Sequence, residues 1–265
     1  MLPLFRRSLI LFFLAIEAVF ANTFQIRDTA YYPVNISQQE ACETAKINAQ
    51  KQAMSKAGLE KGRFADLEIC TDDEAGAKCS LIQESQSYYE GGYLTSTKIF
   101  RQDVENIGNE RQCVVHAEIT LERFKGNPDP NFALSAEVSH KKMFVNQTFS
   151  ISGETTKEAY LYLLGYLPSK DEFYSIVPNS FETMNKVQGK FIFPSKNSNS
   201  KYALEALLPE DFQNEQLSEI MLVLATKDKF SLLNKETAPN FYKRLNELGR
   251  DRWRKINLGY TIVRK

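Results

Sequence analysis

Alanine recurs at every fourth position through one stretch of the chain, SQQEACETAKINAQKQAMSKAGLE at residues 37–60. The alanines concerned are Ala41, Ala45, Ala49, Ala53 and Ala57. Residues four apart lie on nearly the same side of an α-helix, so they form one slanted band of small side chains. Ser37 followed by Glu40 is typical of a helix start, and Gly58 is typical of a helix end. Such a band favours close packing against a sheet, with a seam for a partner helix as the alternative.

The partner sheet is predicted from two later segments, residues 93–104 and 112–123, which flank a turn at residues 105–110. Every second residue of the latter segment is apolar, which places one face of this strand in a core and the other in water. The apolar positions are Cys113, Val115, Ala117, Ile119 and Leu121. A further extended stretch covers residues 24–32. Residues 22–124 therefore predict a small antiparallel sheet with a packed alanine-rich helix.

The first residues of the chain have the pattern of a secretory signal peptide. Arg6 and Arg7 precede an apolar run, and small residues stand at Val19 and Ala21. This pattern predicts export and cleavage after Ala21, with an uncleaved anchor as the alternative. No later apolar segment approaches the roughly 20 residues that a membrane-spanning helix needs, so the processed chain is expected not to be transmembrane.

Four cysteines remain after residue 21, and an even number in an oxidising compartment favours disulfide bonds. Cys42 lies in the alanine band, and Cys113 begins the apolar face of the strand that this band is expected to cover. Cys70 and Cys79 flank a polar loop that contains a glycine. The sequence therefore predicts the pairs Cys42–Cys113 and Cys70–Cys79.

The pattern changes after a polar, proline-containing segment, KGNPDPN at residues 125–131, which we interpret as a linker. Short apolar runs then alternate with turns, as is typical of a β-sandwich. These runs are residues 144–152, 159–166, 173–177, 190–193, 202–208 and 219–226. A helix is expected over residues 239–248, between Thr237 and Gly249, and a short strand over 259–263. The fold class is thus α+β, with an all-β sandwich and a C-terminal helical, basic tail in residues 132–265.

The first part of the chain resembles the N-terminal domain of flagellar assembly protein T. The resemblance rests on the stretches ACETAKINAQKQAMSKAG, ESQSYYEGGYLTSTKI and QCVVHAEITL, and it covers residues 24–124. In that family an alanine-rich helix packs on a small antiparallel sheet. The resemblance implies an envelope protein of bacteria.

The second part resembles the family called domain of unknown function 4384, over about residues 130–233. The matching stretches are KEAYLYLLGYL, SIVPNSFETMNKVQGKFIFPS, KYALEALLP and SEIMLVLATKDKF. That family is a β-sandwich module without assigned chemistry in bacterial exported and signalling proteins. The resemblance implies a periplasmic location and carries no catalytic residues over to this chain.

The residue types that perform catalysis are sparse. The two histidines, His116 and His140, stand in no metal-binding spacing, and no serine lies in a nucleophile elbow. The acidic run Asp72–Glu74 is best interpreted as an exposed loop, with calcium binding as the alternative. The chain carries 33 basic and 33 acidic residues, so it lacks the global basic charge of a nucleic-acid binder. We expect no catalytic residue, no metal and no cofactor, and hence no enzyme.

Two sets of residues are candidate binding surfaces. The basic end of the chain could hold anionic lipid, glycan or an acidic protein face through Arg250, Arg252, Trp253, Arg254 and Lys255. The alternative is a solvated face with Trp253 in the core. Tyr160 and Tyr162 fall on one side of a predicted strand, as an aromatic platform or as core residues.

Together these features predict a non-enzymatic periplasmic interaction protein with protein partners in the cell envelope. It would be accessory to a machine such as a flagellar motor or a secretion system. The alternative function is a periplasmic module that binds peptide or glycan through the aromatic face of the sandwich.

Overall fold

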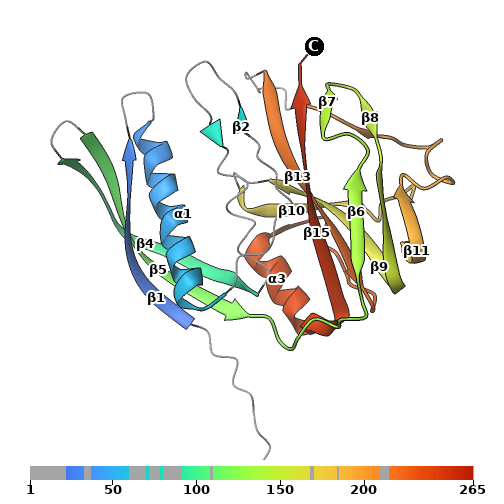
Figure 1. The fold of residues 1–265 in the computed structure, drawn as a ribbon, viewed down its shortest axis with the longest axis horizontal. Helices are drawn as coiled ribbons and strands as arrows, with labels where there is room; N and C mark the ends of the chain where they lie inside the picture. The colour runs from blue at the N-terminus through green and yellow to red at the C-terminus, as the bar shows by residue number, and fades with distance from the viewer. Residues whose placement is uncertain are drawn as a thin grey trace, which may run out of the picture.

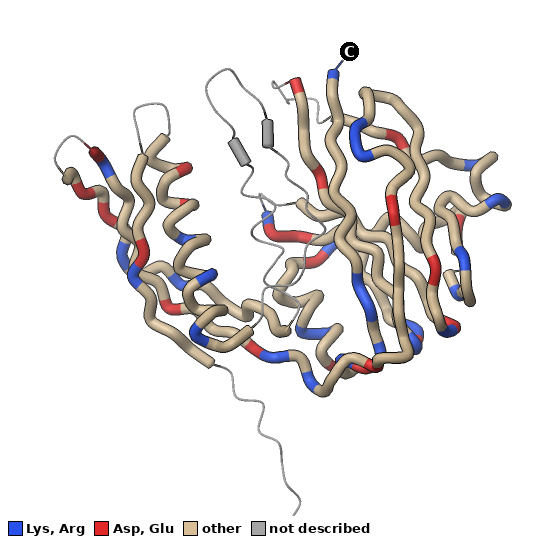
Figure 2. Tube along the Cα trace, in the orientation of Figure 1, with Lys and Arg blue, Asp and Glu red and all other residues tan. Residues whose placement is uncertain are grey.

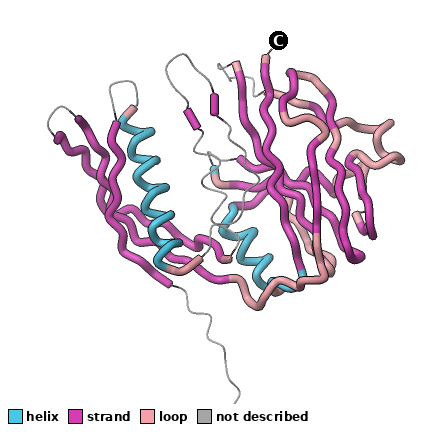
Figure 3. The backbone as a smooth tube through the Cα atoms, viewed as in Figure 1, coloured by secondary structure: helices cyan, strands magenta, loops and turns pink. Residues whose placement is uncertain are grey.

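The computed structural model describes residues 22–32, 37–59, 91–107, 110–167, 170–183, 185–208 and 215–264, and the backbone of residues 70–71 and 78–79. The predicted signal peptide, residues 1–21, and the acidic run Asp72–Glu74 lie outside these ranges. Strands predominate, with two α-helices, α1 and α3, in the described residues (Figure 3). None of the helices in these ranges is long and apolar enough to cross a membrane.

The N-terminal part is a three-stranded antiparallel sheet covered on one face by a helix (Figure 1). The strands are β1 (Asn22–Tyr32), β4 (Gly92–Ile107) and β5 (Glu110–Arg123), in the order β1-β5-β4. Helix α1 (Gln38–Lys56) begins where the backbone N–H of Glu40 donates to the Ser37 hydroxyl, at 3.2 Å. It ends before Gly58, whose φ of 63° suits glycine.

The alanine band packs against this sheet, as predicted. All five alanines are buried in one core with the apolar face of β5. Because their side chains are small, α1 lies close enough to β5 for a disulfide bond between Cys42 and Cys113, with a Cα–Cα distance of 5.1 Å. This predicted pair is confirmed.

The second predicted pair, Cys70–Cys79, falls on residues whose side chains lie outside the described part. Two short strands, β2 (Cys70–Thr71) and β3 (Lys78–Cys79), pair antiparallel with Cys70 opposite Cys79 in the backbone register. The bond itself stays a prediction.

The C-terminal part is built on an eight-stranded sheet with the path β14-β10-β9-β13-β15-β7, in which β6 and β11 also pair with β9. Its strands are β6 (Leu134–Val138), β7 (Lys142–Phe144), β9 (Ile151–Leu167), β10 (Glu172–Val177), β11 (Lys186–Phe193), β13 (Gln216–Thr226), β14 (Lys235–Thr237) and β15 (Trp253–Val263). A separate short pair joins β8 (Thr148–Phe149) to β12 (Leu204–Glu205). Helix α3 (Ala238–Glu247) and the 3₁₀ turn η3 (Arg250–Arg252) precede β15.

Strand β9 joins the two layers of this part. Its first half pairs with β6 and β11, and its second half pairs with β13 and β10. Leu161 and Leu163 face a core between the layers, whereas Tyr162 and Leu164 face a second core beneath α3. Both faces of the second half are therefore buried, which explains its nearly continuous apolar sequence. The predicted α+β class, with a sandwich after the helix-covered sheet, is confirmed.

Several element boundaries differ from the sequence prediction. The run 144–152 is not one strand, because it spans the last residue of β7, all of β8 and the first two residues of β9. Strand β9 then continues to Leu167 and includes the whole run 159–166. The final strand begins at Trp253 rather than at residue 259, so the expected basic tail is the turn η3 followed by a strand that pairs with β13 along its whole length. The strands β6, β7 and β14 were not predicted, because they have only five, three and three residues, although apolar and polar residues alternate in β6.

Residues 125–131 contain no helix or strand and are fixed to the C-terminal part by hydrogen bonds. The Lys125 N–H donates to the Asn246 side chain at 2.7 Å, and the Arg250 N–H donates to the Lys125 carbonyl at 2.7 Å. Just before them, Phe124 packs in a core that includes residues of both parts. Independent folding of the two parts across this linker stays a prediction.

Candidate functional site

Strand β4 is an edge strand of the N-terminal sheet and carries exposed apolar side chains. Within the described residues β4 pairs with β5 alone, while α1 packs on β1 and β5. Four apolar side chains from the middle of the strand to its end are 38 to 56 % exposed: Ile99 (38 %), Phe100 (56 %), Val104 (39 %) and Ile107 (51 %). Figure 1 shows this part of the strand extending away from the larger sheet. An edge strand with these features is a typical protein-binding element.

Charged side chains of both signs alternate with these apolar ones (Figure 2). Arg101 Nε donates to Asp103 Oδ2 at 2.5 Å along the strand. Glu105 accepts a hydrogen bond from Gln112 at 2.9 Å and lies 3.7 Å from Arg27. The strand therefore presents both positive and negative side chains, and not charges of one sign, to a binding partner.

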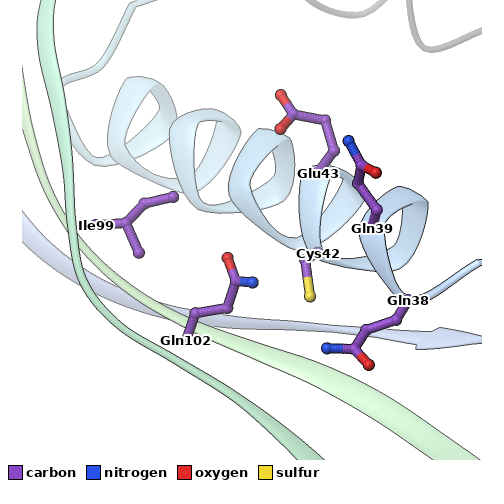
Figure 4. A pocket seen from close by; sticks show the side chains of 6 residues that line it. All are labelled: Gln38, Gln39, Cys42, Glu43, Ile99 and Gln102. Carbon is purple, nitrogen blue, oxygen red and sulfur yellow. The ribbon is translucent and has the colours of Figure 1, made fainter.

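An open groove lies between the first turns of α1 and β4 (Figure 4). Its volume is about 380 Å³, and it is lined by Gln38, Gln39, Cys42, Glu43, Ile99 and Gln102. Ile99 and Gln102 project from β4 toward the helix, while the other four side chains come from α1. Amide and carboxylate groups surround one apolar side chain in the groove. Such a lining suits the binding of a peptide-like segment, which has both polar and apolar groups.

A second hollow of about 440 Å³ lies at the junction of the two parts, where Arg123 and Arg250 are among its lining residues. Arg123 donates to the carbonyl of Ala57 at the end of α1. The Arg250 guanidinium stacks 3.9 Å from the centre of the Trp253 ring. Both cations thus have a structural role within the chain.

The residues of the predicted basic patch are likewise engaged inside the molecule. Trp253 is completely buried, and its ring meets that of Phe124 edge-on at 4.9 Å, in agreement with the packing alternative. Arg252 makes two hydrogen bonds to Asp228, at 2.7 and 2.5 Å. Arg254 donates to the Trp253 carbonyl at 2.8 Å, and Lys255 lies over the Tyr242 ring at 5.6 Å. These positions add no support to binding of lipid or glycan.

The predicted aromatic platform is divided by burial. Tyr162 is 2 % exposed, and its hydroxyl accepts a hydrogen bond from the Phe230 N–H at 2.7 Å. Tyr160 is half-buried, and Lys186 lies 5.7 Å from its ring centre. Tyr162 thus belongs to the core beneath α3, so the two tyrosines do not form an exposed pair.

The two histidines lie apart from one another. The His116 ring stands 6.0 Å from that of Phe100 on the outer face of the N-terminal sheet. His140 pairs with the hydroxyl of Ser139 at 2.9 Å in a turn. Across the described ranges, no group of three or more His, Cys, Asp or Glu side chains could hold a metal ion.

Four carboxylate–tyrosine hydrogen bonds occur in the described residues and were not predicted from the sequence, among them those of Glu182 and Glu219. Buried Glu182 accepts hydrogen bonds from the Tyr202 hydroxyl and from the Ser195 N–H, the latter at 3.1 Å. Glu219 accepts from the Tyr260 hydroxyl, and burial raises the pKa of both side chains. No local sequence signal marks these pairs, because the partners come from separate strands and loops. The Glu182 and Glu219 pairs connect strands and loops of the C-terminal part.

No protein-family model matches the chain, and no curated protein or solved structure is significantly similar to it. The comparisons therefore add no support to the resemblances drawn from the sequence, and the candidate site rests on the geometry of β4.

Proposed function

We propose that the protein is a non-enzymatic interaction protein of the bacterial cell envelope, which binds a protein partner through β4. The observation that carries this proposal is the apolar exposure of one sheet edge, at Ile99, Phe100, Val104 and Ile107. An edge strand offers unpaired backbone groups, and exposed apolar side chains supply the area that an interface buries. We place the protein in an envelope assembly such as a flagellar motor or a secretion system.

The export pattern of the first residues and the Cys42–Cys113 disulfide support a periplasmic location. Disulfide bonds persist in oxidising compartments such as the periplasm. The alternative function, a peptide or glycan module with an aromatic face, gains no support from Tyr162, which is buried.

The proposal is tested by site-specific photo-crosslinking in cells, with the photoreactive residue placed at Phe100 or Ile107. The matched controls are Phe144 and Leu233, which are similarly exposed, at 48 and 50 %, but lie in the C-terminal part. We expect adducts in the periplasmic fraction from the two β4 positions and none from the controls. Equal labelling at all four positions, or none at β4, would refute the proposal.

A further inference from the structure

The edge of β4 that pairs with no strand in the described residues has a charge pattern that is complementary to itself. Its register with β5 assigns the side chains to two faces. Ile99, Gln102 and Val104 lie opposite Ala117, Val115 and Cys113 and so belong to the face that α1 covers. The outer face carries Lys98, Arg101, Asp103 and Glu105. A bulge between Ile99 and Arg101 places one extra residue, Phe100, in the strand.

When two copies of one edge strand pair antiparallel, the two-fold axis is perpendicular to the sheet and each face continues into the same face of the partner. Residues directly opposite each other then share a face, and opposite charges there stabilise the pair. With the axis at Arg101, the arginines of the two copies would lie opposite each other, and with the axis at Asp103, the two aspartates would. An axis at Gln102 instead places Arg101 opposite Asp103 of the second copy, twice.

The bulge extends this match. Because Ile99 and Phe100 together oppose Val104 of the second copy, the next pair is Lys98 with Glu105. Two pairs of opposite charge on the outer face and one apolar contact on the inner face therefore occur on each side of the axis. Without the extra residue, Lys98 would stand opposite Asn106 instead.

The groove beside α1 lies at the same axis. Ile99 and Gln102 line it, so Val104 and Gln102 of the second copy would enter it from the facing strand. The approach of a second copy thus buries side chains that are exposed in the single chain.

We propose that two copies of this chain form a symmetric dimer by antiparallel pairing of their β4 strands, with Gln102 on the two-fold axis. This inference rests on the proposed function, since it names the partner of β4. The pairing would join two three-stranded sheets into one continuous six-stranded sheet, with both copies of α1 on the same face.

Charge reversal tests the dimer and its register on the full exported protein by sedimentation equilibrium at low salt. Lys98→Glu places glutamates opposite each other, and Glu105→Lys places lysines opposite each other. Each variant alone should raise the dimer dissociation constant about tenfold or more, since like charges then face each other twice. Circular dichroism and the melting temperature of each variant show that it is folded.

Mixing the two variants provides the decisive measurement. A heterodimer would oppose glutamate to lysine at both positions, so we expect the mixture to associate about as tightly as the unaltered protein. Lys186→Glu is the control for an exposed lysine outside β4, and it should leave the dimer unchanged. Failure of the mixture to associate would refute the register.

Oxidative crosslinking locates the axis independently. Gln102→Cys should form a disulfide-linked dimer, whereas Thr97→Cys, which would lie opposite Asn106 of the second copy, should not. A protein that is monomeric at every attainable concentration would overturn the dimer, and the bulge and charges of β4 would then serve to prevent pairing. Photo-adducts from Phe100 to a different protein would in that case still support the proposed function, because their mass separates the two outcomes.

Discussion

Asp129 shows how one side chain fixes the segment between the two parts of the chain. Its carboxylate accepts from Lys227 at 2.7 Å, from Lys157 at 2.9 Å and from the Asn131 N–H at 2.9 Å. Hydrogen bonds from the two lysines hold its pKa below the usual range of an aspartate. A carboxylate that is stabilised in the folded state in this way makes stability depend on pH.

We predict that Asp129→Asn lowers the melting temperature near neutral pH and that this difference narrows in acid. The folded-state pKa is depressed, so the stabilisation is fully present above the unfolded value of about 3.9 and is lost as the pH falls toward the lower folded value. Thermal unfolding of both proteins at about pH 7 and about pH 3 measures the difference in melting temperature. Glu158→Gln, in an exposed pair with Lys186, is the control. A difference that stays constant with pH would contradict the prediction.

At the scale of elements, α1 is held to its sheet by shape and by a covalent bond. The alanine band brings the helix near β5, and the bond between Cys42 and Cys113 closes a loop with a sequence separation of 71. Helix α1 packs mainly on β1 and β5, and Gln50 Nε2 donates to Thr97 Oγ1 of β4 at 3.0 Å, while the groove between the first turns of α1 and β4 stays open. Packing of α1 therefore leaves the candidate binding edge accessible.

Replacing both Cys42 and Cys113 by alanine should destabilise the protein by about 4 kcal/mol in the chain-entropy model, because a long loop is released in the unfolded state. Chemical denaturation of the exported variant gives this value. The paired replacement of Cys70 and Cys79, which are close in sequence, should cost less. An equal or larger loss from the second pair would show that loop length does not govern the effect.

At the scale of the whole molecule, the two parts share one hydrophobic core. Phe124 stacks on Tyr93 of β4 at 5.5 Å and contacts Tyr242 of α3 at 6.0 Å. Asn246 bonds to the backbone on both sides of Phe124, through the carbonyl of Arg123 and the N–H of Lys125. The start of β4 is thus buried at the junction, and its exposed half projects from a fixed base.

Phe124→Ala should therefore reduce the free energy of unfolding by about 3–5 kcal/mol, the usual cost of deleting a buried aromatic ring. Denaturant unfolding of the full chain measures the loss. Phe144→Ala removes the same ring from a position that is 48 % exposed, and it should change stability much less. Similar losses from the two variants would mean that Phe124 does not hold the junction together.

Local patterns were enough to predict the helix, the hairpin and the first disulfide. Alanine spacing, a capping serine and strict alternation in β5 are short-range signals, and each has a direct geometric meaning in a helix or strand. The apolar run at residues 159–166 likewise indicated a buried strand. The same patterns placed Cys42 and Cys113 in one interface, where the structure joins them.

Only the tertiary structure decided which surfaces remain exposed. Trp253 and Tyr162 are aromatic residues of the kind that binding surfaces use, yet both are buried in the core beneath α3 and at the junction. The side chains that cover them come from residues distant in sequence. Phe100 and Ile107 have nothing in the local sequence that sets them apart from other strand residues. They are exposed because α1 covers the opposite face of the sheet and no described strand pairs beyond β4. The apolar periodicity of a segment determines which of its side chains could be buried together. Whether they are buried depends on which segments, distant in sequence, pack against them.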